Sequence, residues 1–246
     1  MWREAATTDI GRTTAFYSEL LGWTHHDSKM GEMGIYRHFQ VGGQDVAGCY
    51  QIGPQMQGVP AHWMQYISVA NVDGAAEAVK ANGGTVRMGP LDIPDVGRAA
   101  YCADPQGAMF ALFRDLKGDA PAGAPPFPVG AFCWETLSTT DKNAAVAFYE
   151  KVVGFKVADF QGNTVLGNGD KPEDGVADVE ITPPGVPPHW ISHVVVKNLA
   201  ESRDRTVTLG GKVMMAEIVV PTVGTMAIIL DPVGAAISLY EPAPRA

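Results

Sequence analysis

Cysteine is scarce in this chain. Cys49, Cys102 and Cys133 are the only three in 246 residues, their number is odd, and no Cys-x-x-Cys pair occurs. A disulfide framework and a cysteine-rich zinc site are therefore not expected. We interpret the three thiols as small buried apolar groups, and we expect a protein of the reducing cytoplasm.

Long apolar runs and clusters of positive charge are lacking as well. No stretch approaches the roughly 18 apolar residues of a membrane helix, and the N-terminal residues do not resemble a signal peptide. The net charge is −9 and no run of Lys or Arg stands out, which argues against nucleic acid and anionic membranes as partners. We expect a small organic ligand as the partner, and a monomer or a homodimer.

Familiar catalytic motifs are missing too. The sequence contains no H-E-x-x-H, no G-x-S-x-G, no Walker loop and no G-x-G-x-x-G. What it does contain is apolar material: 46% of the residues are hydrophobic and 18% are charged, which is enough for two cores in a chain of this length.

The strongest pattern is a tandem repeat. The segment from Trp2 through Asp9 and Phe16-Tyr17 recurs from Trp134 onward, at an offset of 132 residues (134 − 2). Three further motifs recur at an offset of 127 (189 − 62): His62-Trp63 and His189-Trp190, Gly83-Gly84 and Gly210-Gly211, Asp104-Pro105-x-Gly107 and Asp231-Pro232-x-Gly234. The second copy has thus lost five residues between the Phe-Tyr helix and the His-Trp pair. We expect this loss in hairpin loops, where changes of length are tolerated.

The repeat sets the predicted architecture. We predict domains over residues 1–117 and 129–246, with a linker over residues 118–128, because residues 118–126 hold three Pro and two Gly. Within each copy the order strand–helix–strand–strand–strand is expected twice, with Asp9 and Asn71 as helix N-caps. The predicted fold class is α+β, and two neighbouring modules would enclose a cup that serves as the ligand site.

These motifs resemble the vicinal-oxygen-chelate family of glyoxalases, bleomycin-resistance proteins and extradiol dioxygenases. The resemblance rests on Asp-x(6)-Phe-Tyr at Asp9 and Asp141, on Gly-Gly and on Asp-Pro-x-Gly, and it covers nearly the whole chain. The Pro-x-His-Trp motif is similar to a tandem actinobacterial branch described as hydroxylases. The resemblance implies four βαβββ modules in two tandem glyoxalase-like domains, with cupped mixed sheets.

The resemblance also implies where a metal would bind. Metal-dependent members hold a divalent ion in the cup with His, Gln or Glu. Counted from the motifs, three of these positions fall in the two copies on Trp2, Met64 and Ala111, and on Trp134, Ile191 and Ser238. The fourth lies near Tyr50 and Glu180. Because Trp, Met, Ile, Ala and Ser are not normal ligands for such an ion, the family's metal is expected to be absent, and no cofactor is expected.

Strand alternation extends the predicted cup linings, because residues two apart share a face. The first cup is predicted to be lined by Trp2, Glu4, Tyr50, Met64, Tyr66 and Phe113. The second is predicted to be lined by Trp134, Thr136, Glu180, Ile191, His193, Ser238 and Tyr240. Both linings are aromatic with a few polar groups, which suits a flat or amphiphilic organic molecule.

Three side chains are candidates for acid–base catalysis. His193 could act as a general base oriented by Glu180, although a histidine on an apolar strand is also an ordinary core residue. Glu4 is predicted to be a carboxylate on the inward face of its strand. The alternative is that this end of the strand is exposed and that Glu4 is solvated. His62 and His189 are interpreted as packing residues. His25 and His26 point to opposite faces, so they cannot chelate one ion together, and His38 stands alone.

Three functions remain open. The first is a metal-free binding protein or enzyme for a small organic molecule. The second is a metal-dependent lyase, dioxygenase or isomerase that uses Glu180 and His193. The third is an interaction module whose cups are filled by large side chains such as Trp2 and Trp134.

Overall fold

The structure is a computed structural model that describes residues 1–31, 34–118, 127–169 and 175–244. Most of the predicted linker, residues 119–126, lies outside the described residues. The predicted order of elements is confirmed, and the α+β chain contains four modules of one strand, one helix and three strands. No helix among the described residues is long and apolar enough to cross a membrane.

Each module is defined by its five elements. The first module consists of β1 (Trp2–Thr7), α1 (Ile10–Leu21), β2 (Thr24–Lys29), β3 (Ile35–Val41) and β4 (Gln44–Gln51). The second consists of β5 (His62–Ser68), α2 (Val72–Ala81), β6 (Thr85–Ile93), β7 (Gly97–Ala103) and β8 (Met109–Asp115). The third consists of β9 (Phe132–Thr139), α3 (Lys142–Val153), β10 (Lys156–Phe160), β11 (Asn163–Gly167) and β12 (Gly175–Ile181). The fourth consists of β13 (His189–Val195), α4 (Leu199–Thr208), β14 (Lys212–Val220), β15 (Gly224–Leu230) and β16 (Ala236–Pro242).

The strands form two mixed eight-stranded sheets with the same topology. The first sheet has the order β2-β3-β4-β1-β5-β8-β7-β6, and the second has the order β10-β11-β12-β9-β13-β16-β15-β14. In each module the first strand runs parallel to the last one, as β1 does to β4 and β13 to β16, while the three following the helix are antiparallel. This is the tandem βαβββ arrangement that the repeat predicted.

The helix ends follow from local side-chain chemistry. Each N-cap side chain accepts a hydrogen bond from the backbone N–H three residues on, which satisfies a donor that the first helical turn leaves unpaired. The caps are Asp9, Asn71, Asp141 and Asn198, and the first two were predicted from the sequence. Helices α1 and α3 both end at a glycine in the left-handed conformation, Gly22 and Gly154.

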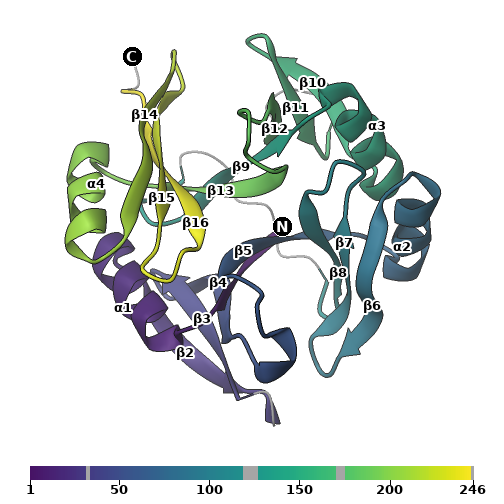
Figure 1. The fold of residues 1–246 in the computed structure, drawn as a ribbon, viewed down its shortest axis with the longest axis horizontal. Helices are drawn as coiled ribbons and strands as arrows, with labels where there is room; N and C mark the ends of the chain where they lie inside the picture. Colours follow the sequence, from purple (N-terminus) through teal and green to yellow (C-terminus); the bar gives the residue numbers. More distant parts are fainter. Residues whose placement is uncertain (32–33, 119–126, 170–174, 245–246) are drawn as a thin grey trace. The chain divides into compact units, whose positions relative to one another are not determined.

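Two compact units divide the modules differently from the sequence repeat. Unit 1 contains α2 and α3 with β6–β8 and β9–β12, and unit 2 contains α1 and α4 with β1–β4 and β14–β16. Among these strands, the chain passes from one unit to the other within β5, near the start of β9 (between Cys133 and Trp134) and within β13. Each unit therefore combines one module from each sequence copy. In each unit the helices of these two modules pack together, α2 with α3 and α1 with α4 (Figure 1).

The repeated motifs meet in the cores of these units. In unit 1, Trp190 Nε1 donates to Tyr149 Oη (2.9 Å), and that hydroxyl donates to Asp104 Oδ2 (3.2 Å). In unit 2, Trp63 Nε1 donates to Tyr17 Oη at 2.8 Å. The Trp and the Tyr of each group come from one copy, and in unit 1 the Asp comes from the other. The His-Trp, Phe-Tyr and Asp-Pro-x-Gly motifs are therefore core motifs.

Burial sets the charge state of these core groups. Burial raises the pKa of Asp104 and of Asp231. The backbone N–H groups that donate hydrogen bonds to their Oδ1 atoms lower it, but by less. Burial, followed by the charge of the neighbouring aspartate, raises the pKa of Tyr17 and of Tyr149 well above its usual value. Both phenols therefore stay neutral hydrogen-bonding groups.

The Gly-Gly motif has a packing reason. A Cβ on Gly84 would lie 2.9 Å from a ring carbon of Phe148, and one on Gly211 would lie 3.0 Å from a ring carbon of Phe16. In both cases the glycine belongs to one copy and the phenylalanine to the other. The same Cβ atoms would lie even closer to a backbone carbonyl oxygen, 2.8 Å from that of Ala103 for Gly84 and 2.6 Å from that of Leu230 for Gly211. The second glycine of each pair is thus required by the close approach of both the neighbouring strand and the aromatic ring.

The five-residue difference between the copies falls in the three-stranded hairpin region, as predicted, but it is shared between strands and loops. Residues 30–34 join β2 to β3, whereas residues 161–162 join β10 to β11. Residues 52–61 join β4 to β5 and include a short 3-10 helix, η2 (Pro54–Met56), whereas residues 182–188 join β12 to β13. Each of these two connections is three residues shorter in the second copy, and strands β10–β12 are together four residues shorter than β2–β4. Residues 168–174, between β11 and β12, are five more than residues 42–43, between β3 and β4, so the net loss is five.

The cysteines are only partly as expected. Cys49 and Cys102 are buried, and burial raises the pKa of each thiol to about 12, so neither is a ready nucleophile. Cys133 is half-buried, in contrast to the prediction, and its Sγ lies 3.4 Å from the His193 carbonyl oxygen.

Candidate functional site

The predicted lining residues share one face of their strands. The helix-facing positions belong to the cores: Ala5, Phe39 and Cys49 in unit 2, and Ile67, Leu112, Leu137 and Val179 in unit 1. Because side chains alternate along a strand, the neighbouring positions point to the face away from the helices. This open face of each unit carries the candidate ligand-binding groups, and their role in binding stays a prediction.

In unit 2 the open face of β1, β3 and β4 combines a carboxylate with two aromatic rings. Glu4 is only 8% exposed, so it is not the solvated strand end that the sequence left open. Trp2 Nε1 donates to Tyr36 Oη at 3.0 Å. Tyr36 crosses Gly48, where a Cβ would lie 1.8 Å from its hydroxyl oxygen. Gly48 is directly opposite Glu4, so this glycine gives Tyr36 the space to reach Trp2.

In unit 1 the open face of β9 and β12 has a different arrangement of the same groups. Trp134 Nε1 donates to Asp178 Oδ1 (2.8 Å), and Thr136 Oγ1 donates to the same oxygen (2.7 Å). Ser138 Oγ donates to Glu180 Oε1 at 2.6 Å, and Glu180 is exposed. Asp178 was missed by sequence reasoning, although it lies two residues before Glu180 on the same face.

Comparison of the two registers shows that one carboxylate has moved to a neighbouring strand. Glu4 on β1 is opposite Gly48 on β4, and the equivalent pair in the second copy is Thr136 opposite Asp178. Each copy therefore keeps one carboxylate at this cross-strand position, supplied by the first strand in one copy and by the last strand in the other.

The other half of the open face in unit 1 is aromatic. Tyr66 Oη and Tyr101 Oη are 3.0 Å apart, and the Tyr66 ring packs edge-on against Phe113 with centroids 5.9 Å apart. Tyr66 is directly opposite Ala111, and Tyr101 is opposite the same residue from the other side. Met64 is buried nearby on β5. Tyr101 was not predicted, because the sequence does not show which residue of β7 lies beside β8.

In unit 2 the open face of β13 and β16 carries polar side chains, including His193, Ser238 and Tyr240. His193 is 4% exposed and directly opposite Ser238, whose Oγ is buried without a hydrogen-bond partner among the described residues. Tyr240 Oη donates to the Val223 carbonyl oxygen (2.8 Å), and burial raises its pKa. Ile191, predicted beside His193, is buried in unit 1.

A histidine pair on β2 and β3 is the second feature that sequence reasoning missed. His26 is directly opposite His38, and their rings stack with centroids 4.5 Å apart and planes at 1°. Asp45 lies beside both: its Oδ1 is 3.1 Å from His26 Nε2, and its Oδ2 is 3.4 Å from His38 Nδ1. The interpretation that His38 stands alone is therefore wrong. Burial lowers the pKa of His38, against the charge of Asp45.

The remaining histidines do not form a site. His62 Nδ1 and His189 Nδ1 lie 2.8 and 2.9 Å from the carbonyl oxygens of Pro60 and Pro187, consistent with their interpretation as loop-packing residues. His25 is exposed on β2 next to His26 in sequence, and the alternation of strand faces separates the two rings.

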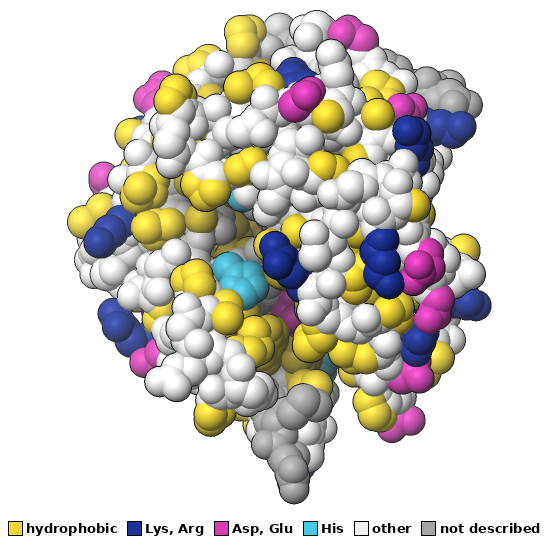
Figure 2. All heavy atoms as spheres, turned by 45° about the vertical axis from the view of Figure 1, so that its right-hand side comes forward, with side chains coloured by type: hydrophobic (Ala, Val, Ile, Leu, Met, Phe, Trp, Pro, Cys, Tyr) yellow, Lys and Arg dark blue, Asp and Glu magenta, His cyan; other side chains and the backbone are white. Residues whose placement is uncertain are grey.

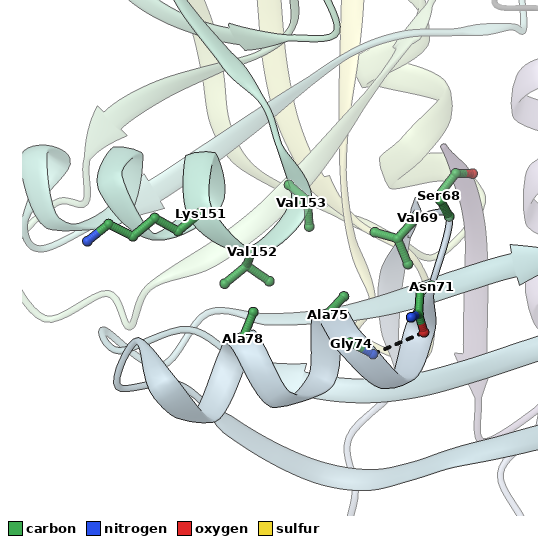
Figure 3. Close-up of a pocket in the computed structure, with 10 residues that line it drawn as sticks. Ser68, Val69, Asn71, Gly74, Ala75, Ala78, Lys151, Val152 and Val153 are labelled. Atoms are coloured by element: carbon green, nitrogen blue, oxygen red, sulfur yellow. Dashed lines mark hydrogen bonds between the residues drawn. The ribbon is translucent and has the colours of Figure 1, made fainter.

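Each unit also has a recess at its helix pair. The unit 1 recess, of about 330 Å³, lies between the start of α2 and the end of α3, and Figure 3 shows Val152 pointing toward Ala75 and Ala78. The Asn71 side chain accepts from Gly74 N, so its oxygen already caps α2 (Figure 3). The unit 2 recess, about 240 Å³, lies between the end of α1 and the start of α4. These paired recesses follow from the repeated helix packing. The unit 2 recess also has charged side chains in its lining, among them Glu19 and Arg205, whose Oε2 and Nη2 atoms lie 3.7 Å apart.

Comparison with known proteins places the chain in a family. A family model described as the glyoxalase/bleomycin resistance protein/dioxygenase superfamily matches residues 4–112. CFP32 of Mycobacterium tuberculosis, which is named provisionally as a glyoxylase, is 33% identical over 99% of this chain and 95% of its own length. The anthracycline biosynthesis protein DnrV of Streptomyces peucetius is 32% identical over 98% of this chain and 92% of its own length. The chain belongs to the glyoxalase/bleomycin resistance protein/dioxygenase superfamily.

Solved structures of other proteins share the fold. A Mn(II)-bound glyoxalase from Novosphingobium aromaticivorans superposes with a TM-score of 0.62 at 16% identity, over 98% of this chain and 80% of the other. The 2,3-dioxygenase LapB from Pseudomonas sp. KL28 superposes with a TM-score of 0.62 at 12% identity, over 100% of this chain and 92% of the other. At these identities the likeness shows the fold alone.

The residues at the superfamily's metal positions do not fit a divalent ion. Trp2 and Trp134 use their indole N–H groups as hydrogen-bond donors, and an indole offers no lone pair to a metal. Met64, Ala111 and Ile191 offer no hard or borderline ligand atom. Ser238 supplies only a neutral hydroxyl, and Glu180 is engaged by Ser138. These side chains therefore do not form a binding site for such an ion.

Proposed function

We propose that this superfamily member binds or transforms a small organic molecule on the open strand faces, without the superfamily's divalent ion. The observation that carries the proposal is the pair of indoles at predicted metal positions. Each indole N–H is held by an acceptor of its own unit, Tyr36 for Trp2 and Asp178 for Trp134. Ring faces and a carboxylate therefore take the place of metal ligands in both copies.

The chemistry of these faces indicates the class of ligand. Trp2 and Tyr36 accompany Glu4 in unit 2, and Trp134 accompanies Asp178 in unit 1. Aromatic rings favour a flat apolar body, and a carboxylate among them favours a cationic group. We therefore propose a planar aromatic compound that carries an amine. The Streptomyces relatives, named for anthracycline biosynthesis, are consistent with a planar aromatic ligand.

If the molecule is transformed, proton transfer is the chemistry that the side chains offer. Both groups belong to unit 2: Glu4 is a buried carboxylate on the open side of β1, and His193 is a buried imidazole on the open side of β13. Either group could take up a proton from a bound ligand. Glu180 is exposed and accepts from Ser138, which gives less support to its predicted role in orienting His193.

The test uses protein treated with EDTA and then desalted. Titration with 9-aminoacridine, a planar cation, is expected to shift the NMR signals of Trp2 and Trp134, whereas 9-anthracenecarboxylate, a planar anion, is expected to bind at least tenfold more weakly. Glu4→Gln should weaken binding of the cation in unit 2 by roughly tenfold, since one charge-assisted interaction is lost. Glu150→Gln, on the exposed side of α3, is the matched control and should leave binding unchanged.

The other outcomes separate the competing functions. Binding that disappears after chelation and returns with Mn²⁺ or Zn²⁺ would contradict the proposal and favour a metal-dependent lyase, dioxygenase or isomerase. The absence of binding by either probe would also contradict it, and would favour an interaction module with filled cups.

A further inference from the structure

The cluster of His26, His38 and Asp45 in unit 2 has the composition of a transition-metal site. One ligand atom from each of the three side chains lies within 4.8 Å of the others. Two imidazoles and one carboxylate form a donor set that suits a borderline divalent ion and leaves further positions open to water. The side chains of His26, Asp45 and His38 are 48%, 38% and 22% exposed, so an ion can reach them from solvent.

Hydrogen bonds from neighbouring side chains orient the proposed ligand atoms. His38 Nδ1 is buried and makes no hydrogen bond within the described residues, although Asp45 Oδ2 lies 3.4 Å away. Ser28 Oγ lies 3.1 Å from the other nitrogen, Nε2. When Nε2–H donates to Ser28, Nδ1 carries a lone pair directed toward Asp45. Gln40 Nε2 donates to Asp45 Oδ1 at 2.8 Å, which orients the carboxylate. Such outer hydrogen bonds typically fix the ligands of metal sites.

We propose that His26, His38 and Asp45 bind one divalent transition-metal ion, of the class of Zn²⁺ or Ni²⁺. The site is separate from the superfamily's metal positions. It lies on β2, β3 and the start of β4, whereas Trp2, Met64 and Ala111 lie on β1, β5 and β8. It is also independent of the proposed ligand class.

The site belongs to the first copy alone. Val165 is opposite Asp178, as His38 is opposite Gly48, so Val165 occupies the position of His38 in the second copy. Ala158 lies opposite Val165 and occupies the position of His26. The second copy therefore lacks both imidazoles, and the stoichiometry should be one ion per chain.

An ion at this site would border the open face of unit 2. The rings of Tyr36 and His38 pack edge-to-face with centroids 4.9 Å apart, and Tyr36 accepts the Trp2 hydrogen bond. His38, Gly48 and Glu4 lie in one cross-strand row, so His38 is two strands from Glu4, roughly 10 Å at the usual strand spacing. The ion would thus place positive charge near a carboxylate and two aromatic rings.

The experiment is a calorimetric titration of tag-free, EDTA-treated and desalted protein with ZnCl₂ alone. The wild type should bind one Zn²⁺ per chain with a dissociation constant below about 100 µM. His38→Ala and His26→Ala should each weaken binding at least tenfold, and Ser28→Ala should weaken it less, because it removes a positioning residue. His25→Ala is the matched control: it removes a histidine from the same strand but the opposite face, and it should stay within twofold of the wild type.

Two further readouts keep the result independent of folding defects. Histidine ring NMR signals of the wild type should shift with Zn²⁺ for His26 and His38 but not for His25. Saturating Zn²⁺ should raise the melting temperature of the wild type and not that of His38→Ala. The proposal is overturned if no saturable binding occurs, if His25→Ala weakens binding as much as His38→Ala, or if the double variant of His26 and His38 still binds one ion. Elemental analysis of His38→Ala also separates an ion held here from one held elsewhere in the chain.

Discussion

At the scale of single residues, the retained tryptophan of each copy shows how a position can keep its role while its partner changes. Trp2 donates to Tyr36, and Trp134 donates to Asp178. Gly48 leaves space for Tyr36, and in the second copy Asp178 itself occupies that cross-strand position. The two copies thus satisfy the same indole N–H with different chemistry.

Asp178 should contribute measurably to stability. Asp178→Ala leaves the Trp134 N–H and the Thr136 hydroxyl without their acceptor, so we expect the free energy of unfolding to fall by about 1–3 kcal/mol. Asp178→Asn keeps an acceptor oxygen and should have a smaller effect. Urea unfolding followed by circular dichroism measures both, and equal stability of the alanine variant and the wild type would contradict the assigned hydrogen bonds.

Asp104 should make stability depend on pH in a defined direction. Its pKa in the folded state is raised by burial above the usual value near 4. The folded state therefore holds the proton more tightly than the unfolded state, and this contribution to stability is present below about pH 4 and is lost as pH rises through the folded-state pKa. Asp104→Asn keeps an acceptor for the backbone N–H groups but does not titrate.

The measurement is the difference in free energy of unfolding, wild type minus Asp104→Asn, from urea titrations at pH 4.5 and pH 7.5. We expect this difference to be smaller at the higher pH. Asp231→Asn should behave in the same way, because burial raises the pKa of Asp231 too. A difference that grows with pH would show that the assigned direction of the shift is wrong.

At the scale of elements, Gly48 connects β4 to the side chains of β1 and β3. A Cβ at this position would collide with the Tyr36 hydroxyl and ring, so Gly48→Ala should displace Tyr36 and break its bond to Trp2. We expect a loss of about 1–3 kcal/mol in the free energy of unfolding. Adding Tyr36→Ser removes the clashing ring, so the double variant should lose less than the sum of the two single variants. Strict additivity in this double-mutant cycle would contradict the proposed clash.

The helices and strands could be predicted from the sequence, but many side-chain contacts between neighbouring strands could not. The repeated motifs, together with strand alternation, predicted the modules and the N-caps at Asp9 and Asn71, because these depend on local chemistry. His26 beside His38, and Asp178 beside Trp134, were missed because cross-strand pairing depends on the length and course of loops such as residues 30–34. A count along the chain gives the face of a strand but does not give the neighbour of each residue.

At the scale of the whole molecule, the remaining predictions concern the distribution of charge and the division into domains. Figure 2 shows Lys and Arg side chains scattered among acidic and apolar ones on the face that it draws. This agrees with the dispersed charges of the sequence, and the absence of a nucleic-acid or membrane partner stays a prediction. The domains over residues 1–117 and 129–246 describe the sequence repeat, whereas the compact units each combine parts of both copies.

The cores indicate that the sequence copies depend on each other for folding. In unit 1, Phe110 of the first copy packs against Tyr149 of the second, with ring centroids 5.3 Å apart, and Tyr149 donates to Asp104. In unit 2, the core combines Phe16 and Leu20 of α1 with Leu199 of α4. A fragment of residues 1–117 would expose the apolar faces of α1 and α2, which bury their side chains against helices of the other copy. Exposed faces of this kind drive association.

We therefore expect the fragment 1–117 to aggregate or self-associate, without the cooperative unfolding of a monomer, and to recover native near-ultraviolet circular dichroism when mixed with the fragment 129–246. The control is the full chain with an engineered protease site in residues 118–128. After cleavage it should remain associated and folded, because the cut leaves both cores intact. Light scattering and urea unfolding decide the outcome. A monomeric fragment 1–117 that unfolds cooperatively would show that each sequence copy is a folding unit by itself, and that the contacts shared between copies contribute little to stability.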